Sequence, residues 1–260
     1  MSPKLTAPVK GYWRDAKRHR YSLLFALPLL VLYEALAAAL SGNPRGDVRN
    51  GADVLLRQAF GFAFGAWGQA VLGALLIGGS VYLVGRDLRG GGGLRFKVFL
   101  WMLVESVLLA LAFGVVVGTV TAQLLRPLGA LSAVLAEAAQ AGGRTGGPVW
   151  MGWWTRLMLS LGAGLYEELL FRVLLVGALG QLARRAFRWT PRSAGIFATV
   201  VGALLFSAFH YVGPYGDPLR LDSFLFRFIA GIFFSAMYLL RGFGITAWTH
   251  ALYDAFLLVL

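Results

Sequence analysis

The chain has 260 residues, of which 58% are hydrophobic and 14% charged, and its mean hydropathy is +0.69. Soluble domains are about 45–50% apolar and about 25% charged, so this composition excludes a water-soluble fold and indicates a polytopic membrane protein. The net charge of +12 is divided among short basic clusters between apolar segments. This distribution argues against nucleic acid as a partner and favours anionic membrane lipids.

Apolar segments follow one another along the chain and predict an all-α bundle of about seven transmembrane helices. The predicted spans are residues 21–40, 67–85, 98–120, 153–179, 194–212, 224–240 and 244–260. An eighth crossing arises if residues 124–139 also span or re-enter. An amphipathic piece at 54–64 is expected to lie at the membrane interface. The glycine run at 90–93 lacks the GK[ST] ending of a phosphate-binding loop, so we expect a flexible connector.

Basic residues are dense in residues 1–20 and in the loops at 86–97 and 184–192. The positive-inside rule then places the basic segment 1–20 in the cytoplasm, and we expect the first apolar segment to be a retained membrane anchor. A turn-rich stretch at 142–148 suggests a boundary. We therefore divide the remainder into an N-terminal transmembrane subbundle, 21–150, and a site-bearing part, 151–260.

Titratable side chains lie inside the C-terminal apolar segments, where an ionised group costs about 2.5–3.5 kcal/mol on insertion scales. They are Glu167, Glu168, Arg172, His210, His250 and Asp254. Such groups are a functional-site hypothesis by default. Two further carboxylates, Glu34 and Glu105, lie in the first and third predicted spans, and we expect them to serve helix packing or to line a cavity.

Spacing along the predicted helices suggests how these groups pair. Glu168 and Arg172 are four residues apart and share a helix face, which leaves Glu167, turned about 100° away, to act as a general base on water. An ion-pair network that fixes helix packing is the alternative. His250 and Asp254 also share a face, so both could face a cavity, or the carboxylate could orient the imidazole by bonding its N–H. A simple intrahelical hydrogen bond is the alternative without a function.

His210 stands near the end of the fifth predicted span, and Phe206 lies four residues before it, where it can pack over the ring. A single transmembrane histidine more often bonds a neighbouring helix than it catalyses. Measured from the loop at 184–192, however, Glu167 and His210 reach similar depths if their helices are antiparallel. We therefore expect the titratable groups to converge on one wet pocket within the bundle.

Several familiar catalytic patterns are absent from the sequence. The chain has no HExxH zinc-protease motif, no G-x-S-x-G elbow and no cysteine. The remaining chemistry is a water molecule activated by glutamate, with or without a metal ion.

The three patterns Glu-Glu-x-x-x-Arg, Phe-x-x-x-His and His-x-x-x-Asp, in this order over residues 153–260, resemble the CPBP family of intramembrane proteases. This family includes the type II CAAX prenyl endopeptidases and bacteriocin-processing, Abi-like proteins. The resemblance implies an all-helical membrane endopeptidase that processes a peptide or protein. By this resemblance, Glu167 would activate water with the help of His210, and Glu168 and Arg172 would support the site.

The resemblance assigns His250 and Asp254 to the developing oxyanion or to a metal. Many relatives carry Asn at the position of Asp254, and an ionised Asp cannot donate a hydrogen bond to an oxyanion. Asp254 is then protonated, orients His250, or binds a metal. A divalent metal such as zinc would have as its ligands Glu167, His210, His250 and Asp254.

Two other functions remain open from the residues alone. One is a catalytically silent immunity protein that binds a bacteriocin-like peptide. The other is a proton-coupled transporter, since Glu and His also form proton relays, although titratable groups gather only in the C-terminal half.

Overall fold

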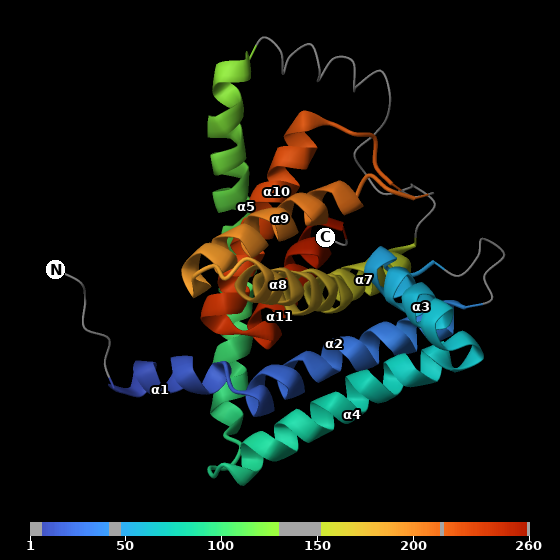
Figure 1. Ribbon diagram of the computed structural model, residues 1–260, viewed down its shortest axis with the longest axis vertical. Coiled ribbons are helices and arrows are strands. Elements are labelled where there is room, and N and C mark those ends of the chain that lie inside the picture. The colour runs from blue at the N-terminus through green and yellow to red at the C-terminus, as the bar shows by residue number, and fades with distance from the viewer. Residues whose placement is uncertain (1–6, 42–47, 130–151, 214–215, 259–260) are drawn as a thin grey trace. The chain divides into compact units, whose positions relative to one another are not determined.

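The computed structural model describes residues 7–41, 48–129, 152–213 and 216–258, and every regular element in these ranges is helical (Figure 1). The all-α architecture predicted from the apolar periodicity is therefore confirmed. Most of the suggested extra span at 124–139 and the turn-rich stretch at 142–148 lie outside the described residues.

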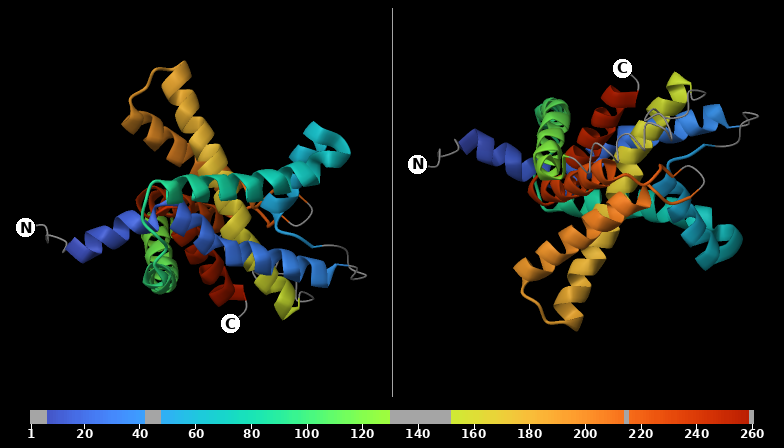
Figure 2. Two further views of the ribbon diagram at one scale, coloured as in Figure 1. Left: turned by 90° about the horizontal axis from the view of Figure 1, so that it is seen from below. Right: turned by 90° about the horizontal axis from the view of Figure 1, so that it is seen from above.

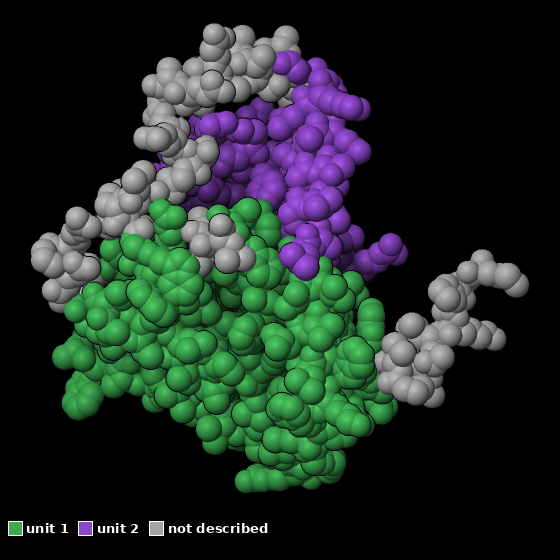
Figure 3. Space-filling model, turned by 180° about the vertical axis from the view of Figure 1, so that it is seen from behind, with its two compact units in different colours: residues 1–110, 152–170, 237–260 green, residues 111–151, 171–236 purple. Residues whose placement is uncertain are grey.

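The chain forms two compact units, and each combines segments that are distant in the sequence (Figure 3). Unit 1 contains residues 1–110, 152–170 and 237–260, and unit 2 contains residues 111–151 and 171–236. Because unit 1 draws on both sides of residue 150, the division into 21–150 and 151–260 stays a prediction from sequence.

Unit 1 is built around α2, which packs against α4, α7 and α11. Its helices are α1 (Ala7–Ala16), α2 (His19–Leu40), α3 (Gly51–Phe64), α4 (Gly68–Arg89), the first half of α5 (Phe96–Leu125), α7 (Trp153–Gly162), the π-helical η3 (Ala163–Glu167) and α11 (Phe243–Leu258). Leu29 and Tyr33 of α2 are completely buried in this core, together with Met158 of α7 and Ala247 of α11.

Helices α3 and α4 form a hairpin, which the sequence analysis did not predict. The chain turns at Gly65, whose φ of 57° is in the left-handed region that favours glycine. A Cβ at Gly68 would lie 2.5 Å from the carbonyl oxygen of Phe60, so only glycine lets the two helices approach here. The expected interfacial piece at 54–64 is therefore packed against α4.

Unit 2 contains most of η4 (Leu169–Val176), α8 (Gly177–Ala186), α9 (Pro191–Phe209), most of α10 (Leu221–Arg241) and the second half of α5. Figure 2 shows α8 and α9 as a helical hairpin. Thr190 caps the start of α9 by accepting a hydrogen bond from the Ser193 amide, and Pro191 occupies the first turn. Phe113 of α5 stacks on Phe234 of α10 with ring centroids 4.5 Å apart.

Five helical segments in the described part of the chain are long and apolar enough to cross a membrane. They are His19–Leu40, Gly51–Arg89, Phe96–Leu125, Pro191–Phe209 and Leu221–Arg241. The predicted span 153–179 is instead made of α7, two π-helical segments and α8, and α11 has 16 residues. The count of seven spans stays a prediction.

Glu105 of α5 lies in an ion-pair network that joins α5 to α1 and to the end of α10. Its two oxygens accept hydrogen bonds from Arg241 Nε and Nη2, each at 2.5 Å, and one of them also accepts from the Tyr12 hydroxyl. Burial, together with the hydrogen bond to Glu105, raises the pKa of Tyr12 above its ordinary value. These contacts give Glu105 the helix-packing position that its isolated place in an apolar segment suggested.

The glycine run after α4 is tied to α2 rather than being a free connector. The buried Arg20 guanidinium bonds Asp87 at 3.1 Å and the Gly91 carbonyl at 2.7 Å, and it also contacts the Gly92 carbonyl. Gly91 and Gly92 have φ values of 90° and 81°, which explains the choice of glycine.

Replacing Gly164 by Ala should destabilise the fold, because its Cβ would lie 2.6 Å from the Cβ of Ala251 and would clash with the Ala247 carbonyl. We expect a loss of about 1–3 kcal/mol in the free energy of unfolding in detergent micelles. The matched control is Gly73→Ala on α4, where an added Cβ meets nothing within 4 Å. That change should be neutral or stabilising by up to about 1 kcal/mol. Equal stabilities of the two variants would contradict the close packing of η3 on α11.

Candidate active site

The segment that carries Glu167 and Glu168 is π-helical rather than a regular α-helix. α7 ends at Gly162, η3 includes Glu167, and η4 begins at Leu169. π-Helical turns accommodate an extra residue per turn and occur frequently at functional sites. The regular helix predicted over 153–179 was wrong in this respect, and the difference changes the directions in which the two carboxylates point.

Two glycines allow this segment to be enclosed by its neighbours. A Cβ at Gly162 would lie 2.6 Å from the ring of Tyr33 and 2.7 Å from the Cβ of Asn50. Gly164 faces Ala251 and the backbone of α11 on another side. These glycines therefore allow a close helix approach just before Glu167, which brings α2, the start of α3 and α11 of unit 1 around the glutamate pair.

Glu168 and His250 form a direct hydrogen bond. Glu168 Oε1 lies 2.7 Å from His250 Nδ1, and both side chains are buried, with exposed fractions of 0% and 5%. An ionised carboxylate accepts only, so Nδ1 carries the hydrogen atom of this bond. The contact fixes the orientation of the imidazole ring and directs Nε2 to the opposite side.

Asp254 occupies the other side of the His250 ring. Its Oδ2 lies 3.8 Å from Nε2, which is an ion-pair distance but too long for a hydrogen bond. Of the alternatives open from sequence, a hydrogen bond from the ring to Asp254 Oδ2 is not formed at this distance, and Glu168, from another segment, bonds the ring at Nδ1. The spacing of four residues brings Asp254 near His250 without deciding which nitrogen faces which carboxylate.

Glu167 is buried and points toward the start of α3. Its Oε1 accepts a hydrogen bond of 2.9 Å from Nδ2 of Asn50, which is also buried. The adjacent glutamates thus have different partners in unit 1, Asn50 for Glu167 and His250 for Glu168. The suggested pair of Glu168 with Arg172 joins residues of different units and stays a prediction.

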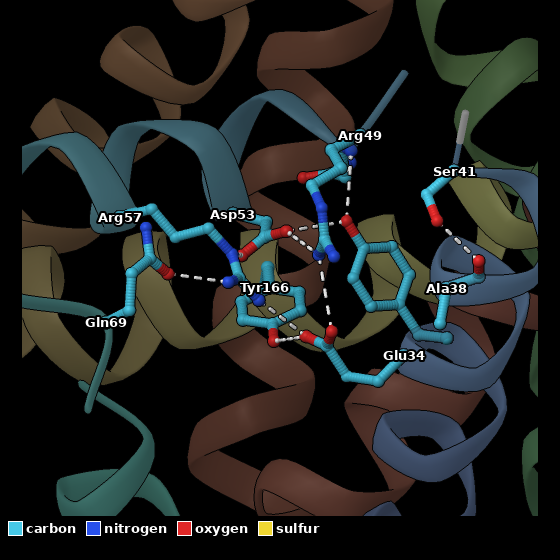
Figure 4. A network of polar contacts seen from close by, with 10 residues as sticks. Glu34, Ala38, Ser41, Arg49, Asp53, Arg57, Gln69 and Tyr166 are labelled. Atoms are coloured by element: carbon cyan, nitrogen blue, oxygen red, sulfur yellow. Dashed lines mark hydrogen bonds and ion pairs between the residues drawn. The ribbon is translucent and has the colours of Figure 1, made fainter. Parts of the chain in front are cut away.

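A cluster of acidic and basic side chains adjoins Asn50 (Figure 4). Asp53, which is fully buried, accepts from Arg49 at 2.9 Å and from Arg57 at 2.5 Å. Glu34 accepts from Arg57 and from the Tyr166 hydroxyl, each at 2.7 Å. Burial works against the charge of Arg49, but the hydrogen bond and charge of Asp53 outweigh it and raise the pKa of Arg49.

The sequence analysis missed this cluster, although part of its signal was present. Arg49, Asp53 and Arg57 recur at intervals of four, the spacing of ion pairs on one helix face. Glu34 was expected to be a helix-packing group, and its partners Arg49 and Arg57 come from 15 and 23 residues further along the chain. No local pattern reveals such partners.

His210, in unit 2, is the first residue after α9. Its Nδ1 lies 2.8 Å from the carbonyl oxygen of Phe206, so Nδ1 donates and Nε2 of the neutral ring carries the lone pair. The rings of Phe206 and His210 meet edge to face with centroids 4.9 Å apart. The predicted packing of Phe206 on the histidine is confirmed, and the two contacts together fix the imidazole.

Arg172, also in unit 2, is buried, and its guanidinium lies over the ring of Phe206. Its guanidinium carbon lies 4.3 Å from the centroid of the Phe206 ring and 5.3 Å from that of Phe234. Its Nη2 is 3.5 Å from the Gly231 carbonyl. These cation–π contacts fix Phe206, so Arg172 supports the orientation of His210 through the aromatic ring between them.

A metal ion is not part of the site as the structure describes it. Within the described residues, no group of three or more His, Asp or Glu side chains has a geometry that could hold a metal ion. The proposed ligands come from both units, so the metal site stays a prediction, and no step below depends on it.

Replacing Glu168 by Ala should leave the buried His250 N–H without its acceptor and lower the free energy of unfolding by about 1–3 kcal/mol. Glu168→Gln should lose less, because the amide oxygen can still accept from Nδ1. Thermal unfolding of the purified variants in detergent checks the order. An Ala variant as stable as the parent would show that the Glu168–His250 contact does not stabilise the fold.

One family model matches the C-terminal part of the chain, over residues 148–256, and is described as type II CAAX prenyl endopeptidase Rce1-like. No curated protein and no solved structure matches. The matched range contains all six titratable residues singled out from the sequence. Residues 148–256 therefore form an Rce1-like domain, a match that supports the resemblance to the CPBP intramembrane proteases, and the five apolar helices support an integral membrane protein.

Proposed function

We propose that the chain hydrolyses a peptide bond near the membrane, with Glu167 as the base that takes a proton from the attacking water. The observation that carries this proposal is a buried carboxylate that is hydrogen-bonded by Asn50 and lies beside the Glu168–His250 pair. A base held in a fixed orientation in a site of low dielectric constant can generate a nucleophile from water.

The hydrolysis proceeds in two steps. Water adds to the carbonyl carbon while its proton passes to Glu167, which produces a tetrahedral oxyanion. The C–N bond then breaks, and the proton held by Glu167 goes to the leaving amine. We also propose that His210 assists, as the resemblance of residues 148–256 to the family implies.

We assign the oxyanion contact to His250. In its protonated form the ring donates from Nε2 while Nδ1 remains bonded to Glu168. Asp254, at 3.8 Å from Nε2, balances the charge of that ring. This role suits an ionised carboxylate and accounts for Asp where many relatives carry Asn. Glu168 and Arg172 act as positioning residues for His250 and His210 respectively.

For the substrate we propose a peptide or protein with a lipid-modified C-terminal segment. The support is the description of the matching family, which names CAAX prenyl endopeptidases. The apolar exterior of the helices would bring such a substrate to the site along the membrane. We also propose that the N-terminus lies in the cytoplasm.

The Glu167→Gln variant tests the mechanism, because Gln preserves the shape of the side chain but cannot take a proton at neutral pH. We expect cleavage to fall by about 10²–10⁴-fold with membrane insertion and unfolding temperature unchanged. The probes are a farnesylated peptide whose cysteine is followed by three residues, labelled with a fluorophore and quencher, and a library of apolar peptides.

The control is Glu105→Gln, which alters another carboxylate of the membrane region outside the proposed site and should cleave within a few-fold of the parent. Retained cleavage in Glu167→Gln would remove Glu167 from the mechanism. A parent protein that binds these peptides without cleaving them would favour the silent immunity protein instead.

A further inference from the structure

Asn50 lies 117 residues before Glu167 and outside the range 148–256 that matches the protease family. It nevertheless makes a hydrogen bond to the carboxylate on which the proposed mechanism depends. We infer that Asn50 is a positioning residue that holds the Glu167 carboxylate in its reactive orientation, an inference that rests on the proposed role of Glu167.

The direction of the Asn50 side chain follows from its second contact. Asn50 precedes α3 and caps it, with Oδ1 accepting a hydrogen bond of 2.9 Å from the Ala52 backbone N–H. An amide oxygen can only accept and an amide NH₂ can only donate. Because the cap requires the oxygen, Nδ2 must face Glu167, and the acceptor there is the carboxylate oxygen Oε1.

The backbone of Asn50 is also held in place. Its N–H donates to the Tyr33 hydroxyl at 3.2 Å, and that hydroxyl donates to Asp53 Oδ2 at 2.8 Å. Asp53 is in turn bonded by Arg49 and Arg57. Tyr33 and Asp53 are completely buried. The acid–base cluster of Figure 4 therefore gives Asn50 little freedom to move.

The contact between the start of α3 and the end of α7 is close as well as polar. Gly162, five residues before Glu167, allows the Cβ of Asn50 and the ring of Tyr33 to lie against the backbone of α7. The position of α3 is thus set relative to the helix that continues into Glu167. A rigid donor at a fixed distance from Oε1 determines the plane of the carboxylate and, with it, the direction of Oε2.

Loss of this donor should affect the rate of the chemical step more than substrate binding. A base that can rotate spends less time in the geometry that accepts a proton from water, which lowers kcat. The inferred role of Asn50 is to orient the base rather than to bind the substrate, so KM should change little. A residue that only capped α3 would instead lower stability and leave kcat of the folded protein unchanged.

Two variants separate these roles. Asn50→Asp keeps a capping oxygen, and Asn50→Gly is also tolerated at a helix N-cap, but both remove the amide donor to Glu167. We expect each to lower kcat by about 10- to 100-fold with KM within about twofold, using the farnesylated fluorogenic peptide. The matched control is Thr190→Ala, which removes the cap of α9 and should keep the kcat of the parent.

A second measurement does not require activity. Thermal unfolding of Asn50→Gly, Glu167→Ala and the double variant forms a cycle, and a direct bond predicts that the double variant loses less stability than the sum of the single losses. Additive losses would overturn the inference, as would Asn50→Asp and Asn50→Gly variants with the kcat of the parent. If the Asn50 variants keep the kcat of the parent while Glu167→Gln is inactive in the same assay, only the inferred role of Asn50 is overturned. If Glu167→Gln is active, the proposed function itself fails.

Discussion

An ionisable side chain in the apolar part of a membrane protein needs a partner, and this requirement determines how unit 1 is arranged. Glu168 is bonded by His250, Glu105 by Arg241, and Glu34 and Asp53 by Arg49 and Arg57. The pairs of Glu168, Glu105 and Glu34 join segments that are separated in the sequence, whereas those of Asp53 lie four residues away on either side. The long-range pairs therefore do more than neutralise charge, since each one also specifies which segments lie next to each other.

Small residues make those pairings geometrically accessible. Hydrogen bonds between buried side chains require the helix axes to be close, and Gly162 and Gly164 remove the side chains that would keep α2, α3 and α11 apart from η3. The π-helical turns then direct Glu167 and Glu168 to different neighbours. The proposed division of roles, a base for water and a support for His250, follows from this local departure from regular helix geometry.

The N-terminal half contributes to the site more than its sequence suggests. The family match covers residues 148–256, yet the hydrogen bond to Glu167 comes from Asn50, and Tyr33 packs against Gly162. The catalytic unit that we propose therefore includes helices that precede the matched range. In unit 2, Arg172 and Phe206 hold His210 by contacts within the matched range.

The sequence by itself determined the helical class, the membrane setting and the titratable residues that are candidates for the site. These follow from apolar periodicity and from the cost of charge in lipid, which are local properties of each segment. The contact of Phe206 with His210 was also predictable, because four residues along a helix place two side chains on one face.

Only the tertiary structure decided which groups meet. Helical periodicity says which side chains share a face, but not which other helix that face contacts. Thus the spacing of four residues suggested Asp254 as a partner for the His250 ring, whereas the hydrogen bond comes from Glu168, 82 residues away. The partners of Glu34, Glu105 and Glu167 were hidden for the same reason, since they come from other segments that only long-range packing brings near.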